Sequence, residues 1–181
     1  MRNLKTIIMG TCMAGLALMS CQQQSDTQLT VSGLDPMAFD TVISEKQVKL
    51  YTLKNSNGME VCITNYGGRV VSLVVPDKEG KPTDVVLGFD NIAQYADTLN
   101  SPSDYGSSVG RYANRINQGR ITVDGKEYQL TQNDGKHCLH GGGATGWMNK
   151  VYDAEQIGDS ILKLSLVSPD GDNGFPGEVK V

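Results

Sequence analysis

Short runs in which apolar and polar residues alternate fill most of the chain after residue 45. A two-residue period puts successive side chains on opposite faces of an extended strand, so the pattern predicts β-structure. Asn-Gly, Tyr-Gly-Gly and Glu-Gly-Lys-Pro turns separate the first predicted strands. These strands cover Val48–Lys54, Met59–Thr64, Arg69–Val75 and Asp84–Phe89.

Two further hairpins continue the pattern. Ile121–Leu130 turns at Asp124-Gly125, residues that suit the positive backbone angles of a tight turn. A second hairpin joins Val151–Ile157 to Ser160–Val167. The one helical candidate is Asn91–Leu99, a turn or two in length. Regular turns at such short spacing predict an all-β fold, either a sandwich or a barrel.

The N-terminus has a different character. Met1–Ser20 combines the basic residues Arg2 and Lys5 with a short apolar run, which is typical of a secretory signal and too short to span a membrane as a helix. Its Leu-x-Ser-Cys ending resembles a bacterial lipobox, in which Cys21 becomes the lipidated first residue. The alternative is an ordinary signal peptide cut near the same place. We therefore expect an exported protein, lipid-anchored to the bacterial cell envelope on its periplasmic or outer-membrane side.

Residues 21–44 are polar and lack periodicity, which indicates a flexible tether between this anchor and the folded domain, residues 45–181. Cys12 leaves with the signal, so Cys62 and Cys138 remain. The two could pair in an oxidising compartment, but two cysteines on separate strands are more often core residues, and we expect no disulfide framework. The net charge is −4 for the full chain, and becomes about −6 once two basic residues leave with the signal. An acidic chain without a basic patch argues against nucleic-acid binding, and we expect a monomer.

Tyr105–Gly142 holds the richest set of polar side chains. Glycines, arginines and an Asn precede the predicted hairpin Ile121–Leu130, and a His-Gly-Gly follows it. Sugars offer hydroxyl groups, so a sugar site needs fixed donors and acceptors on a rigid frame, with glycines that permit close approach. This pattern is that of a candidate carbohydrate site.

Three ordered blocks closely resemble the aldose 1-epimerase (galactose mutarotase) family. The first is Gly-Arg-x-Ala-Asn-Arg-Ile followed by the Val-Asp-Gly-Lys-x-Tyr-x-Leu hairpin and Leu-His-Gly-Gly. Ile63–Asp90 resembles the family's opening strands, and Ser168–Val181 resembles its Ser-Pro-Asp-Gly-x-x-Gly-Phe-Pro-Gly segment. Together the blocks span roughly residues 45 to 181. The resemblance implies the N-terminal part of the large mutarotase-like β-sandwich.

The family interconverts the α and β anomers of aldohexoses such as galactose or glucose, without a cofactor. Its acid is a His in an Asn-His-x-Tyr-Phe motif and its base is a later Glu. Neither motif occurs in these 181 residues, so both groups are expected downstream of Val181. On this interpretation the chain is a fragment that binds sugar but is inactive alone. The alternatives are a non-catalytic carbohydrate-binding lipoprotein and a truncated product without a stable fold.

By residue-by-residue match, Asn114 and Arg115 correspond to the family's sugar-binding Asn-Arg, and His140 to the histidine that contacts the sugar near its ring oxygen. Considered without the resemblance, Arg115 could instead tie loops together through carboxylates, and His140 could be a turn residue. Arg111 is expected to be structural, beneath the site. His137 is assigned no role.

Two segments contain possible metal ligands, but neither predicts a metal site. His137, Cys138 and His140 offer ligands, but no second cluster completes a tetrahedral site. The segment from Asp170 starts like a calcium loop and lacks the later ligands. Trp147 could stack on a sugar, although core packing is the favoured interpretation.

Overall fold

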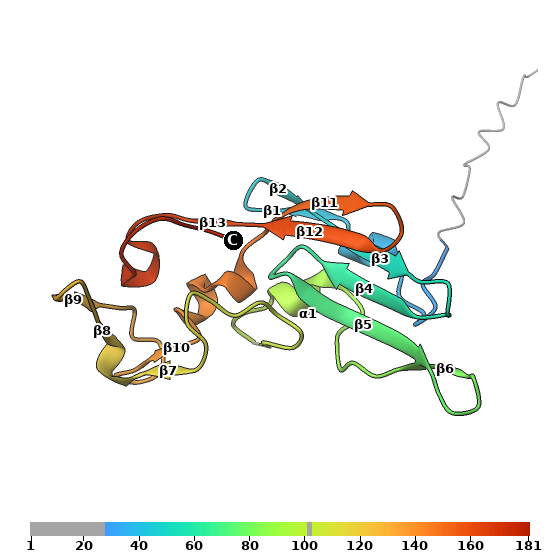
Figure 1. The fold of residues 1–181 in the computed structure, drawn as a ribbon, viewed down its shortest axis with the longest axis horizontal. Helices are drawn as coiled ribbons and strands as arrows, with labels where there is room; N and C mark the ends of the chain where they lie inside the picture. Colours follow the sequence, from blue (N-terminus) through green and yellow to red (C-terminus); the bar gives the residue numbers. More distant parts are fainter. Residues whose placement is uncertain (1–27, 101–102) are drawn as a thin grey trace, which may run out of the picture.

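The computed structural model describes residues 28–100 and 103–181. An antiparallel sheet in the order β3–β4–β5–β6 lies at its centre (Figure 1). These strands cover Leu50–Lys54, Glu60–Thr64, Arg69–Pro76 and Pro82–Asp84. Exposure alternates along β4, where Glu60, Cys62 and Thr64 are buried. The two-residue alternation in the sequence therefore matches a buried face and a more exposed face of the sheet.

Shorter elements surround this sheet. The two-stranded pairs are β1–β2 (Thr41–Ile43, Lys46–Val48), β7–β10 (Arg115–Ile116, Cys138–Leu139), β8–β9 (Arg120–Val123, Lys126–Gln129), β11–β12 (Asp153–Ile157, Ile161–Ser165) and β13–β14 (Val167–Ser168, Val179–Lys180). The helical turns are η1 (Pro36–Phe39), α1 (Ile92–Ala96), η2 (Asn117–Gly119), η3 (Gly143–Thr145), η4 (Trp147–Asn149) and η5 (Asp172–Gly174). The prediction of a β-rich fold is confirmed.

The β11–β12 hairpin runs alongside β3, although about 100 positions separate them in the chain (Figure 1). The backbone N–H of Lys54 donates to the carbonyl of Asp159 at 2.7 Å, and Gln156 Nε2 donates to the carbonyl of Thr52 at 3.1 Å. The other short pairs, β7–β10 and β8–β9, gather at the end of the molecule away from β6. Leu130, Cys138 and Phe175 form a small apolar cluster there.

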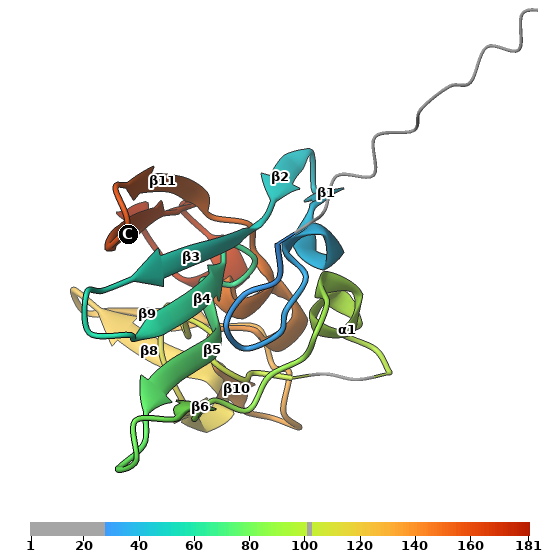
Figure 2. The same cartoon turned by 90° about the vertical axis from the view of Figure 1, so that its right-hand side faces the viewer.

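The segment before β1 packs against the main core. Its helical turn η1 lies beside α1 (Figure 2). Leu34 and Phe39 are buried, and the Phe39 ring lies 6.4 Å from that of Tyr95 in α1. The backbone N–H of Val31 donates to Oε1 of the buried Glu60 at 2.7 Å. The predicted tether over residues 21–44 is therefore wrong for its described part. Apolar side chains spaced too irregularly to form a strand pattern still bury themselves against the sheet.

The strand predicted at Asp84–Phe89 is also corrected, because pairing with β5 ends at Asp84. Asp84 Oδ1 accepts hydrogen bonds from the backbone N–H groups of Leu73 and Val86, both at 3.0 Å. The side chain takes the place of a ladder carbonyl and ends the strand. The helix predicted at Asn91–Leu99 is confirmed, but it is shorter than predicted, since α1 covers Ile92–Ala96.

The predicted signal peptide and the predicted lipidation site Cys21 lie outside the described residues. Over residues 28–100 and 103–181, no helix is long and apolar enough to cross a membrane.

Candidate functional site

The two predicted sugar-binding segments meet at the short β7–β10 ladder. Arg115 pairs with Leu139, and Ile116 pairs with Cys138. The ladder is only two residues long on each side, yet it places Asn114 directly opposite His140. Sequence positions 26 apart are thereby fixed next to one another.

Asn114 and His140 exchange two hydrogen bonds. The backbone N–H of His140 donates to the carbonyl of Asn114 at 3.0 Å, and the backbone N–H of Asn114 donates to the His140 ring nitrogen Nδ1 at 3.0 Å. A ring nitrogen that accepts a hydrogen bond carries no proton, so the neutral imidazole holds its proton on Nε2. His140 is thereby presented as a hydrogen-bond donor through Nε2.

His140 forms part of the wall of a pocket of about 170 Å³. The other lining residues come from the loop after α1, the stretch before β10, and η3 and η4: Thr98, Ser103, Asp104, Asn133, Leu139, Gly143, Ala144, Met148 and Asn149. The wall mixes carboxylate, amide and hydroxyl groups with the apolar side chains of Leu139 and Met148. Such a lining suits a small ligand that carries several hydroxyl groups.

Arg115 faces different surroundings. Its Nε lies 2.5 Å from Asp134 Oδ2, and its side chain is more than half exposed. It lines a second, wider and more apolar groove together with Tyr112, Ile116 and Phe175. The ion pair to Asp134 is the loop-tying role that the sequence alone left open for Arg115.

Arg69 was not identified from the sequence. It is fully buried at the start of β5, a strand whose other residues are apolar except for Ser72. Nη1 donates to the carbonyl of Ser103 at 2.9 Å, and Nη2 donates to the carbonyl of Met148 at 2.8 Å. Ser103 and Met148 lie in different walls of the pocket. One buried guanidinium thus holds both walls on the central sheet.

The environment of Arg69 is mostly uncharged. Its guanidinium carbon lies 5.7 Å from the ring centre of Tyr66 and 5.2 Å from that of Tyr95, distances suited to cation–π attraction. Burial lowers the pKa of Arg69, while Tyr66, Tyr95 and Asp104 oppose that shift. The signal in the sequence was an arginine placed on the inward face of the strand Arg69–Pro76, where an apolar residue was expected.

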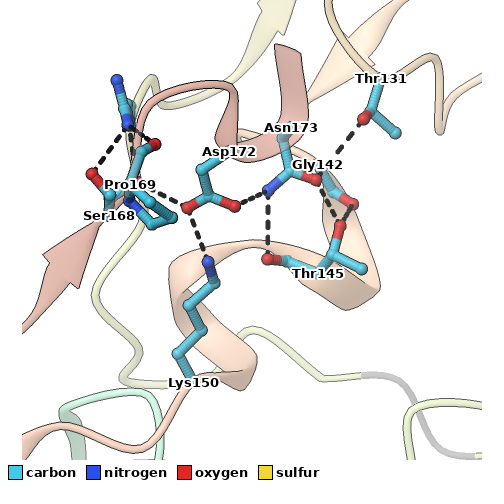
Figure 3. A network of polar contacts seen from close by, with 9 residues as sticks. Thr131, Gly142, Thr145, Lys150, Ser168, Pro169, Asp172 and Asn173 are labelled. Atoms are coloured by element: carbon cyan, nitrogen blue, oxygen red, sulfur yellow. Dashed lines mark hydrogen bonds and ion pairs between the residues drawn. The ribbon is translucent and has the colours of Figure 1, made fainter. Parts of the chain in front are cut away.

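Arg111 has the structural role predicted for it. Its Nε donates to Ser168 Oγ at 2.8 Å, and its terminal nitrogens donate to the carbonyls of Ser168, Pro169 and Pro176. Asp172 Oδ2 accepts from Ser168 Oγ and from Lys150 Nζ, both at 2.6 Å (Figure 3). Burial would raise the pKa of Asp172, but the hydrogen bonds from Lys150 and Ser168 outweigh it and lower that pKa.

The remaining candidates lie apart from the pocket. His137 Nδ1 accepts from the backbone N–H of Gln118 at 3.2 Å. Trp147 packs its ring against Gly110, where any side chain would overlap the indole. Cys62 and Cys138 are buried and unpaired with each other. Among the described residues, no three His, Cys, Asp or Glu side chains gather in a group that could hold a metal ion.

Comparison with known proteins identifies relatives of this chain. A sequence model of the family described as aldose 1-epimerase matches residues 49–181. The chain is 42% identical over 126 residues to galactose mutarotase from Bos taurus, which covers 70% of this chain and 35% of that protein. It is 38% identical over 135 residues to aldose 1-epimerase from Haemophilus influenzae, covering 74% and 37% of the two chains.

Solved structures show the same fold. A crystal structure of an aldose epimerase homologue from C. elegans matches with a TM-score of 0.66 and 33% identity, over 74% of this chain and 40% of that one. Galactose 1-epimerase from Lactobacillus acidophilus matches with a TM-score of 0.66 and 30% identity, over 77% and 40%. The chain therefore spans about 35 to 40% of the length of these relatives. The predicted mutarotase-like fold is confirmed for this portion.

Proposed function

The chain belongs to the aldose 1-epimerase family, and on that basis we propose that it supplies part of the sugar site of an enzyme that interconverts the α and β anomers of aldohexoses such as galactose or glucose. Asn114, Arg115 and His140 are the proposed sugar-binding residues. The observation that carries the proposal is the pairing of Asn114 with His140, which lines a pocket of mixed polar and apolar character.

The proposed chemistry opens and recloses the sugar ring. A base takes the proton from the anomeric hydroxyl while an acid protonates the ring oxygen, and the bond between that oxygen and the anomeric carbon breaks. The open aldehyde rotates about its bond to the next carbon, and the ring recloses on the other face. Both proton-transfer groups are proposed to come from the part of the relatives' length that this chain does not span.

His140 is proposed to act as a donor rather than as the acid. The Asn114 amide bonded to Nδ1 leaves the proton on Nε2. A hydrogen bond from Nε2 to the ring oxygen would stabilise the charge that develops there as the ring opens. Arg115 and Asn114 are proposed to bind hydroxyl groups that do not react, so they contribute to binding before and during reaction alike.

The location of the protein is part of the proposal. The basic and apolar N-terminus and the Leu-x-Ser-Cys sequence support export and lipid attachment at Cys21. The protein is proposed to act as a monomer at the cell envelope.

Ligand titration followed by amide NMR tests the sugar site. Galactose should shift the amide signals of His140, Asn114 and Gly143, whereas galactitol, which cannot close into a ring, should not. Polarimetry on the complete gene product then separates an epimerase from a carbohydrate-binding lipoprotein without activity. Galactose shifts that map away from the pocket, or no shifts at all, would contradict the proposed site.

A further inference from the structure

His140 lies in a glycine-rich loop that has few hydrogen bonds of its own, among them the bond from the Gly142 N–H to the carbonyl of Leu139 at 3.1 Å. The loop runs from Leu139 to Thr145 and contains three consecutive glycines, so its backbone has many accessible conformations. His140 itself has a backbone φ of +50°, which is unfavourable for a residue with a side chain. Contacts from outside the loop must therefore fix the imidazole.

Asn133 supports the start of the loop. Its Oδ1 accepts from the backbone N–H of Leu139 at 2.8 Å, and its Nδ2 donates to the carbonyl of Leu139 at 3.0 Å. The amide therefore bonds both backbone groups of the residue that precedes His140. Its Nδ2 also lies so close to Gly143 that a Cβ there would have to displace it.

Asn173 supports the far end of the loop from η5 (Figure 3). Its Nδ2 donates to the carbonyl of Thr145 at 3.2 Å, and its Oδ1 accepts from the Thr145 hydroxyl. The same Oδ1 fills the space that a side chain at Gly142 would occupy. Glycine at 142, with φ +128°, thus allows the Asn173 amide to touch the loop.

Asn173 is itself held in place. Its Nδ2 also donates to Asp172 Oδ1 at 3.1 Å, and the other oxygen of Asp172 is bonded by Lys150 and Ser168. The loop is therefore bonded at its start to the stretch before β10 through Asn133, and at its far end to the Arg111 and Asp172 network through Asn173.

We propose that Asn133 and Asn173 are positioning residues for His140, which clamp the two ends of its loop so that Nδ1 stays on the Asn114 amide and Nε2 faces the sugar. The consequence for sugar binding rests on the proposed function. The effect on which His140 ring nitrogen carries the proton does not rest on the proposed function, and it can be measured on the chain without any ligand.

The test replaces each amide by a carboxylate of nearly the same shape. Asn133→Asp and Asn173→Asp keep the accepting oxygen and lose the donor, and they place a negative charge against a carbonyl. Asn57→Asp makes the same charge change in the exposed β3–β4 turn and is the matched control. Long-range proton–nitrogen NMR of the His140 ring, recorded at about pH 8, reports which ring nitrogen carries the proton.

The wild-type chain and Asn57→Asp should show a single form with the proton on Nε2. Asn133→Asp and Asn173→Asp should show a mixture of the two ring forms, and should weaken galactose binding roughly threefold to tenfold, as expected for a lost hydrogen bond. An unchanged ring pattern in both variants, with galactose still bound, overturns the positioning role. A changed ring pattern in a chain that binds no galactose sustains the positioning role and counts against the proposed function.

Thr145 gives a milder variant in case an Asp variant does not fold. Its side chain is exposed, so Thr145→Val should leave folding intact while removing the hydroxyl bond to Asn173. Thr145→Ser keeps that hydroxyl and should restore the wild-type ring pattern. Equal ring patterns in Thr145→Val and Thr145→Ser would count against the clamp.

Discussion

Arg69 Nη2 donates a hydrogen bond of 2.8 Å to the carbonyl of Met148, which lies 79 positions later in the chain. The bond joins the central sheet to the short helix η4 that forms one wall of the pocket. With the bond from Nη1 to Ser103, it makes the position of both walls depend on one side chain.

Replacing Arg69 by Met should therefore lower the free energy of unfolding by about 3 kcal/mol or more, because several carbonyls that the guanidinium satisfies lose their donor. Urea unfolding measures the change. Arg120→Met, on the exposed face of β8, is the control and should change stability by no more than about 0.5 kcal/mol. If the unfolding free energies of Arg69→Met and Arg120→Met differed by less than about 1 kcal/mol, the value of one hydrogen bond, the role given to Arg69 would be contradicted.

In a protein of the relatives' full length with the proposed epimerase activity, His140→Ala should reduce turnover by about 10²–10³, because a donor to developing charge is removed. Polarimetry from the pure α anomer of galactose gives the rate. His137→Ala is the matched control, because that ring bonds Gln118 outside the pocket. Turnover of His140→Ala within twofold of wild type would show that His140 is not the ring-oxygen donor.

Arg115→Ala should raise KM by about fivefold and change turnover little, because a bond to an unreactive hydroxyl stabilises ground and transition states alike. Its ion pair with Asp134 is largely exposed and should contribute no more than about 1 kcal/mol to stability. Asp134→Asn separates the two roles, since it removes the ion pair and keeps Arg115. An Arg115→Ala variant with unchanged KM would leave Arg115 with the structural role alone.

The acid stability of the chain should depend on Asp172. Its pKa is lower in the folded chain than in the unfolded chain, where carboxyls of this type titrate near about 3.9. Ionised Asp172 therefore stabilises the fold above that unfolded value, and the stabilisation is lost as the pH falls through the lower folded pKa.

Unfolding free energies measured from about pH 7 down to about pH 2 check this, because the contribution of ionised Asp172 should shrink as the pH falls below its unfolded pKa. Asp172→Asn should be less stable than wild type at neutral pH and should converge with it in acid. Asp159→Asn, in the exposed turn after β11, should follow the wild-type curve. A constant difference between Asp172→Asn and wild type at every pH would exclude a contribution from ionisation.

Cys21→Ser should abolish metabolic labelling with a fatty-acid analogue and release the protein from the membrane fraction. Cys12→Ser alters a cysteine of the proposed signal instead and should leave both properties unchanged. Membrane fractionation that does not respond to Cys21→Ser would indicate a different attachment or an ordinary signal peptide.

Local patterns were enough to predict much of the fold. The hairpin at Asp124-Gly125 and the one that joins β11 to β12 needed only alternation and turn residues, and both formed as expected. The strand end at Asp84 depended on a side chain that bonds two backbone amides, and periodicity does not report such a bond. The burial of Phe39 depended on Tyr95, a partner far away in the sequence.

The candidate site also contains residues that the sequence could predict and contacts that it could not. Motif resemblance identified His140 and Asn114, and the structure brings them together. It could not show that Arg115 faces Asp134, or that Arg69 supports both walls, because each of these contacts joins segments that only the folded chain brings near. The loop supports at Asn133 and Asn173 were hidden for the same reason, since asparagine is also an ordinary turn residue.

The bond from Val31 to Glu60 limits how far the domain can stand from a membrane. With Cys21 lipidated as proposed, residues 21–31 would link the lipid anchor to the domain, because the backbone of Val31 is hydrogen-bonded to Glu60 of β4. Ten residues pulled straight reach at most about 35 Å, no more than roughly the thickness of a bilayer. An anchored molecule would work close to the lipid headgroups, and sugars would reach its pocket from the thin layer of water beside them.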